Sequence, residues 1–165
     1  MIGDRWGVTD AEVARHYPCD DIVRDPVLQA WRGVTVRATA GEIWPWVGQI
    51  RLAPYSYDWI DNLGRRSPRE LRGLPEPEVG ERFTTAAARR RIGRIVSVEH
   101  GVQLTGRLGF AVMSYVLVPE GDRTRLLLKV VTESGRLTAP LLSVGDLVMA
   151  RRQLLNLQRL AEGGG

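Results

Sequence analysis

WRGVTVRATAGEIWPWVGQI, residues 31–50, changes from the periodicity of a strand to that of a helix. In residues 31–38, side chains such as Trp31 and Thr35 alternate with Val34 and Val36, and a period of two is typical of a strand. Thr39-Ala40-Gly41-Glu42 then forms a capping box, which predicts a helix start. Pro45 removes an interior hydrogen bond, so the helix should be short or kinked.

The second half of the chain is rich in predicted strands. Turn residues at 100–101 and 120–122 separate runs with strand composition. Tight turns between consecutive strands indicate an antiparallel sheet. The predicted strands are 79–85, 91–99, 101–109, 110–118 and 123–134, and a long helix of about 138–162 follows them.

The remaining segments are shorter. Thr9 and Glu12 form another capping box, which predicts a helix that stops before Pro18. Residues 18–30 are interpreted as an extended lead-in, residues 56–63 as a second short helix, and residues 64–80 as a loop. We therefore expect a lead-in of 1–30 packed on one domain of 31–162, and a disordered tail of 163–165.

These elements predict an α+β fold of the helix-grip type. A curved antiparallel sheet of about six or seven strands would wrap around the C-terminal helix, with two short helices after the first strand. One helix covering a curved sheet leaves space beneath it, and we expect that space to be a ligand cavity.

Composition excludes several classes of function. The net charge is +4, but the arginines are scattered, and the densest run, 89–91, has no interleaved aromatic residue, so nucleic acid is not expected as a partner. No stretch approaches the ~18 apolar residues of a membrane span, and no signal peptide is recognised. A single cysteine, Cys19, fits a cytoplasmic protein. Two histidines, His16 and His100, provide no metal set, so neither a metal nor another cofactor is expected.

The chain resembles the SRPBCC superfamily, which includes START lipid-transfer domains and polyketide cyclases. The resemblance covers about residues 31–160 and is seen in WRGVTVRATAGEIWPWVGQI (31–50), YSYDWIDNL (55–63) and VGERF (79–83). These stretches are similar to those of a bacterial, polyketide-cyclase-like subgroup. The resemblance implies the helix-grip fold, an apolar pocket between sheet and C-terminal helix, no obligatory metal, and binding or transformation of a hydrophobic small molecule.

Tyr57, Asp58 and Arg94 are the candidate catalytic residues. A tyrosine of this segment could donate a hydrogen bond to a ligand carbonyl, and Asp58 beside apolar walls would have a raised pKa suited to proton transfer. The alternative is that Asp58 and Asp61 only complement a helix dipole. Alternation in 91–99 puts Arg94 and Val96 on one face at the pocket edge, where Arg94 could also be a rim residue whose charge reaches solvent.

The candidate ligand-binding residues are mostly apolar or aromatic. In 123–134, Leu128 and Val130 should face the cavity while Arg125 and Lys129 face outward. In 110–118 both faces are apolar enough to point inward, which leaves the orientation open. The expected lining is Trp46, Tyr55, Trp59, Val96, Met113, Tyr115, Leu128, Val130, Leu147 and Met149, although for Trp46 a place in the core is the favoured interpretation.

Three functions follow from this pattern. The first is binding of a lipid, polyketide or aromatic metabolite by a monomer or homodimer. The second is a cyclase-like or dehydratase-like enzyme that moves protons without a metal. The third is a non-enzymatic module that binds a protein partner through its basic surface.

Overall fold

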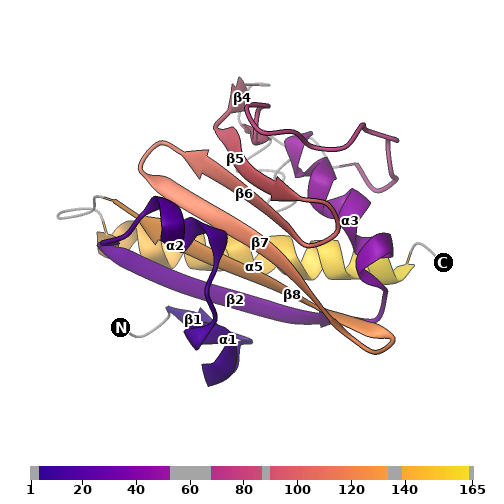
Figure 1. The fold of residues 1–165 in the computed structure, drawn as a ribbon, viewed down its shortest axis with the longest axis horizontal. Coiled ribbons are helices and arrows are strands. Elements are labelled where there is room, and N and C mark those ends of the chain that lie inside the picture. Colours follow the sequence, from indigo (N-terminus) through magenta and orange to yellow (C-terminus); the bar gives the residue numbers. More distant parts are fainter. Residues whose placement is uncertain (1–3, 53–67, 87–89, 134–138, 164–165) are drawn as a thin grey trace.

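The computed structural model describes residues 4–52, 68–86, 90–133 and 139–163, with side chains described except at 85, 86, 90–92 and 139–149 (Figure 1). The chain has a mixed α+β fold. No helix among the described residues has the length and apolar character needed to cross a bilayer. The elements in chain order are β1 (Arg5–Trp6), α1 (Asp10–Ala14), α2 (Pro18–Ile22), β2 (Leu28–Val36), α3 (Ala40–Gly48), a 3-10 turn (Gln49–Arg51), β3 (Thr84–Ala86), β4 (Arg90–Ile92), β5 (Arg94–Glu99), β6 (Gln103–Leu108), β7 (Ala111–Glu120), β8 (Arg123–Thr132) and α5 (Ala139–Gly163).

A six-stranded sheet in the order β1-β2-β8-β7-β6-β5 forms the centre of the molecule. Every pairing is antiparallel except that of the two-residue β1 with β2. The first long strand pairs with the last, from Leu28 opposite Thr132 to Val36 opposite Thr124. This pairing brings the start of the domain beside its end, so α5 can return along the sheet.

Strands β3 and β4 pair with each other as a separate two-stranded sheet next to β5. The segment before β3 bonds to β5 through Gly80 N–H to the Ile95 carbonyl and Ile95 N–H to the Glu81 carbonyl, both 2.8 Å. Phe83 N–H reaches the Gly93 carbonyl at 3.4 Å. The predicted strand over 79–85 therefore lies at this edge, although its regular part is limited to Thr84–Ala86.

The main core lies between one face of the sheet and helices α3 and α5. In Figure 1, α5 lies behind the sheet and runs alongside β2. The C-terminal half of α5 is fixed to β2, because Gln158 Nε2 donates to the Thr35 carbonyl at 2.7 Å and Glu162 accepts the Arg37 N–H at 2.9 Å. The buried cluster on this face is Val34, Val36, Ala38, Ile43, Trp44, Trp46, Val47, Ile50, Phe83, Ile95, Leu104, Tyr115, Leu117, Leu126, Leu128, Val130, Leu154 and Leu157.

The opposite face of the sheet is covered by the N-terminal segment, which lies in front of the sheet in Figure 1. Tyr17, Cys19 and Val23 come from this segment and pack on sheet residues. Those sheet residues are Trp31, Val112, Val116, Leu127 and Val131. The sequence of β7 is apolar on both sides because the sheet is covered on both sides.

This coverage changes the environment of two predicted surface cations. Lys129 and Arg125 do point away from α5, as expected, but the N-terminal segment covers them. Lys129 is 4% exposed and pairs with Asp20 of α2. Arg125 pairs with Glu12 of α1.

The predicted capping boxes are present at the starts of α1 and α3, and α3 accommodates Pro45 in its interior. The extended lead-in over 18–30 was wrong at its start, because Pro18–Ile22 form α2. Pro18 sits at the first helical position, where its missing N–H costs little. Asp20 then accepts the Tyr17 N–H at 2.9 Å. The second short helix predicted over 56–63 lies outside the described residues.

Candidate ligand-binding site

The face of the sheet turned toward α5 brings together five of the predicted ligand-binding residues. Tyr115 lies opposite Leu128 and Met113 lies opposite Val130 in the β7–β8 pairing. Trp46 reaches the same cluster from α3. The open question of which β7 face points inward is therefore answered, because alternate residues from Met113 to Leu117 face α5.

A polar pair crosses this apolar interior. The Tyr115 hydroxyl of β7 donates to Gln153 Oε1 of α5 at 2.6 Å. Tyr115 is 2% exposed and Gln153 is 8% exposed. Most buried polar groups are hydrogen-bonded, and this bond links β7 directly to α5 inside the core.

Phe83 closes the interior on the β6 side. A side-chain carbon added to Gly106 would lie 2.1 Å from Cδ2 of the Phe83 ring, so the ring rests directly on the β6 backbone. The Phe83 and Tyr115 rings lie 6.2 Å apart between centroids. Gly106 inside a strand pattern is a sequence signal for such a close approach, and sequence reasoning did not use it.

The described side chains of α5 lie in its C-terminal part, from residue 150 onward. Leu154 and Leu157 in the C-terminal half are fully buried against the sheet. Leu147 and Met149 belong to the N-terminal half, whose backbone is helical and whose side chains lie outside the described set. Since α5 runs alongside β2, this half lies toward the end of the sheet that carries Val130 and half-buried Met113.

Gln153 was missed by sequence reasoning. It lies four residues before Leu157 and three after Ala150, so it shares the inward stripe of α5. The stripe spacing was a signal that could have identified it.

Arg94 and Val96 do not belong to the sheet face that is turned toward α5. A β-bulge between Ile95 and Ser97 changes the register, so Ile95 faces the main core and Val96 packs on the cluster under the N-terminal segment. Arg94 is exposed and donates from Nη1 to the Gly80 carbonyl at 3.1 Å. The expected shared face of Arg94 and Val96 toward the cavity was therefore wrong, because a bulge interrupts strict alternation. Tyr55, Tyr57, Asp58 and Trp59 lie outside the described residues.

Two pockets lined entirely by described residues lie away from the space between sheet and α5. One, of about 280 Å³, lies between α3 and residues 71–77. Beside it, Trp44 Nε1 donates to Glu76 at 2.9 Å, and His100 Nδ1 lies 2.8 Å from the same oxygen. These two contacts, that of Trp44 first, lower the pKa of Glu76. The other pocket, of about 660 Å³, lies on the opposite face of the sheet between α1 and strands β2, β7 and β8.

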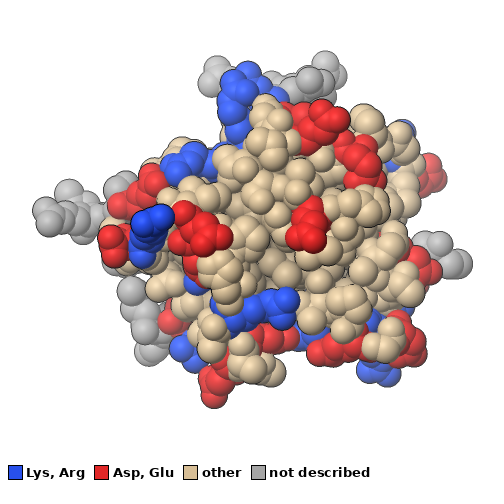
Figure 2. Space-filling model, in the orientation of Figure 1, with Lys and Arg blue, Asp and Glu red and all other residues tan. Residues whose placement is uncertain are grey.

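Charges of both signs are interspersed on the face drawn in Figure 2. On that face, the described basic residues form no large single-sign patch, and acidic side chains lie among them. This distribution gives no support to an acidic partner on this side of the molecule.

Comparison with known proteins shows the fold alone. No family model matches the chain, and no curated protein matches it. Among solved structures, protein Ms6760 from Mycobacterium smegmatis has a TM-score of 0.59 at 13% identity, over 84% of this chain and 93% of that one. Protein MLL2253 from Mesorhizobium loti has a TM-score of 0.56 at 15% identity, over 84% and 99%. A protein from Arthrobacter aurescens has a TM-score of 0.55 at 15% identity, over 82% and 87%. The chain therefore shares its α+β fold with small bacterial proteins.

Proposed function

We propose that this chain is a helix-grip protein of the SRPBCC superfamily that binds a hydrophobic small molecule between its sheet and α5. The resemblance of residues 31–50 and 79–83 to that superfamily supports the proposal. So does the arrangement of a largely antiparallel sheet whose inner face packs on a long C-terminal helix.

The observation on which the proposal depends most is the Tyr115–Gln153 hydrogen bond inside an apolar interior. Small-molecule sites are mostly apolar, with a few placed polar groups that fix the orientation of the ligand. A phenol and a carboxamide in this position can exchange part of their mutual contact for a carbonyl or hydroxyl of a ligand. An aliphatic or aromatic body would then lie against Met113 and Val130.

The ligand would enter beside the N-terminal half of α5. The C-terminal half is held to β2 by two hydrogen bonds and packs with fully buried leucines, so ligand-sized space there would require those contacts to break. Met113 is half-buried and Val130 buried at the opposite end. Leu147 and Met149 belong to the part of α5 beside this end and complete the proposed lining.

Catalysis would depend on Tyr57 and Asp58. Arg94 is poorly placed for it, because its guanidinium is exposed and bonded to the backbone at the β5 edge. If the protein is a cyclase-like or dehydratase-like enzyme, Tyr57→Phe and Asp58→Asn should each lower turnover at least ~10-fold. Undiminished turnover in both variants would remove Tyr57 and Asp58 from the mechanism.

Native mass spectrometry tests the binding proposal. The purified chain should carry one bound apolar molecule per chain. This molecule is either retained from the cell or taken up from a panel of fatty acids and polycyclic aromatic ketones. Met113→Trp fills the proposed space and should abolish the adduct. Phe110→Trp changes an exposed residue of the adjoining turn and should leave it intact. Equal adducts in both variants, or none in the native chain with any member of the panel, would refute the proposed site.

A further inference from the structure

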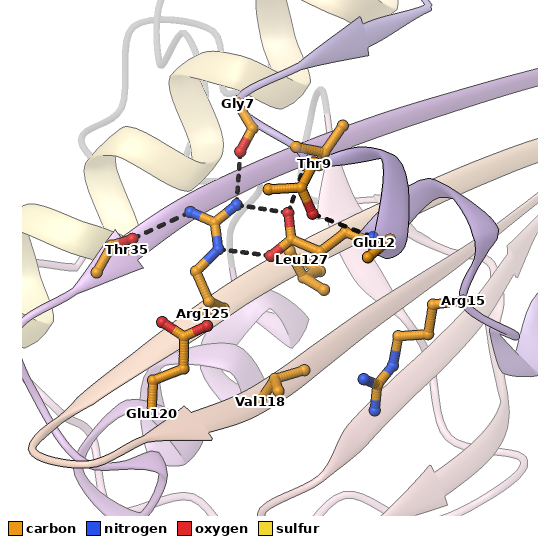
Figure 3. A pocket seen from close by; sticks show the side chains of 11 residues that line it. Gly7, Thr9, Glu12, Arg15, Thr35, Val118, Glu120, Arg125 and Leu127 are labelled. Atoms are coloured by element: carbon orange, nitrogen blue, oxygen red, sulfur yellow. Dashed lines mark hydrogen bonds and ion pairs between the residues drawn. The ribbon is translucent and has the colours of Figure 1, made fainter.

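A second pocket lies on the opposite face of the sheet, where α1 approaches the β7–β8 hairpin (Figure 3). Its volume is about 660 Å³, which is within the usual range for small-molecule sites. Gly7, Val8, Thr9, Ala11, Glu12, Arg15, Thr35, Val118, Glu120, Arg125 and Leu127 line it.

An ion pair between β8 and α1 forms one wall of the pocket. Arg125 donates from Nε to Glu12 Oε1 at 2.7 Å and from Nη2 to Oε2 at 2.8 Å. Its Nη1 reaches Thr35 Oγ1 at 3.0 Å, and Nη2 also reaches the Gly7 carbonyl. The two side chains are 12% and 16% exposed. The two charges of this wall neutralise each other, so the wall offers no net charge to a ligand.

The remaining two charges lie at the rim. Arg15 comes from the residue after α1, and Glu120 ends β7. Figure 3 shows them on opposite sides of the pocket with Val118 between them. Both residues are exposed, and among the described residues neither side chain makes a hydrogen bond or a salt bridge, although Glu120 interacts electrostatically with Arg125.

The surface between these charges is apolar. Leu127 is fully buried beneath the pocket, and Val118 is half-buried beside it. Val118 and Glu120 are two residues apart on one strand face, a separation of roughly 7 Å. In Figure 3, Val118 is drawn between Glu120 and Arg15, so an apolar side chain lies between the two charges.

We propose that this pocket binds an extended zwitterion, with a carboxylate on Arg15, an ammonium group on Glu120 and an apolar chain over Val118 and Leu127. The guanidinium of Arg15 can hold a carboxylate through two parallel hydrogen bonds. A simple anion would form no hydrogen bond with Glu120, and a simple cation would form none with Arg15. The pocket as a whole is neutral and selects a neutral ligand with separated charges. This site is independent of the proposed hydrophobic site, because the sheet lies between them.

The probe for the test is 6-aminohexanoate, followed by amide shifts in two-dimensional NMR of the whole chain. Saturable shifts are expected at residues 8–15 and 118–127, with a Kd in the low millimolar range because both rim charges are solvated. Hexanoate and hexylammonium each lack one charge, and glycine lacks the separation. All three should bind at least 10-fold more weakly.

Variants assign the contacts. Arg15→Gln and Glu120→Gln should each weaken 6-aminohexanoate binding at least 5-fold. Arg24→Gln and Asp122→Asn change exposed charges outside the pocket and should leave the Kd unchanged. Equal affinity for the four compounds, insensitivity to the two rim variants, or no saturable shift up to 50 mM probe would overturn the proposal.

Discussion

The hydroxyl of Tyr115 on β7 donates a 2.6 Å hydrogen bond to Gln153 Oε1 on α5. It joins the sheet to the C-terminal helix inside the main core, near the Phe83 ring. The same pair therefore contributes to the stability of the fold and supplies polar groups to the proposed ligand site.

Removal of the Tyr115–Gln153 hydrogen bond should destabilise the protein, and the effects of changing the two residues should not be additive. Tyr115→Phe is expected to lower the free energy of unfolding by about 1–2 kcal/mol, because Gln153 loses a donor in an apolar surrounding. Gln153→Leu should cost a similar amount, and the double variant should cost less than the sum of the two. Urea unfolding of the four proteins measures the coupling. Strict additivity would mean that the bond contributes nothing to stability.

The contact between Gly106 and Phe83 should be sensitive to a single methyl group. Gly106→Ala places a carbon 2.1 Å from the ring and should cost about 2–3 kcal/mol, because the packed ring has to shift. Gly41 offers a matched control in α3, where the added carbon has only Thr39 Oγ1 nearby, at 3.9 Å. Gly41→Ala should stabilise the protein by about 0.5–1 kcal/mol. Thermal unfolding should separate the two variants in opposite directions, and a neutral Gly106→Ala would contradict the packing.

The free energy of unfolding should fall in acid, partly because Glu12 becomes protonated. Its hydrogen bonds from Arg125, above all, lower its pKa below the ordinary value of 4.5. Because the folded-state pKa is lower than the unfolded one, Glu12 adds stability above pH 4.5, and this is lost as pH falls through the folded-state pKa. Glu12→Gln should be less stable at pH 7 and should lose less stability between pH 5 and pH 3. Asp122→Asn, in the exposed β7–β8 turn, should follow the native curve; a Glu12→Gln curve parallel to the native one would contradict this linkage.

Cys19 should report whether α2 leaves the sheet. Burial above all raises the pKa of its thiol to about 11, and its backbone N–H donates to Ser114 Oγ at 2.9 Å. Alkylation at pH 8 should therefore be at least 100-fold slower than in urea, since the thiolate is the reactive form. Lys129→Met breaks the buried pair with Asp20 and should accelerate alkylation at least 10-fold, whereas Arg24→Gln should not. Rapid alkylation of the native chain would show that α2 is not held on the sheet.

The sequence predicted the parts of the fold that depend on local signals. The capping boxes at Thr9 and Thr39 begin helices, and the alternation after Trp31 continues a strand, because these patterns act over a few residues. The inward orientation of Tyr115 depended on which covering element meets each face, which is set by contacts distant in sequence. Val96 was misplaced because it lies in the bulge between Ile95 and Ser97, where strict alternation is interrupted, so Ile95 and Val98 both face the main core. Helix α2 had a usable signal, namely Pro18 at its first position followed by Asp20 and Asp21.

Carbon-13 NMR of the methionine methyl groups tests the central claim most directly, because the chain has three methionines and two of them belong to the proposed lining. A bound fatty acid or polycyclic aromatic ketone should shift the signals of Met113 and Met149 and leave that of Met1 in place, with Met113→Leu assigning the first signal. Unchanged Met113 and Met149 signals in the presence of a ligand that binds by mass spectrometry would place the ligand elsewhere and contradict the proposed site.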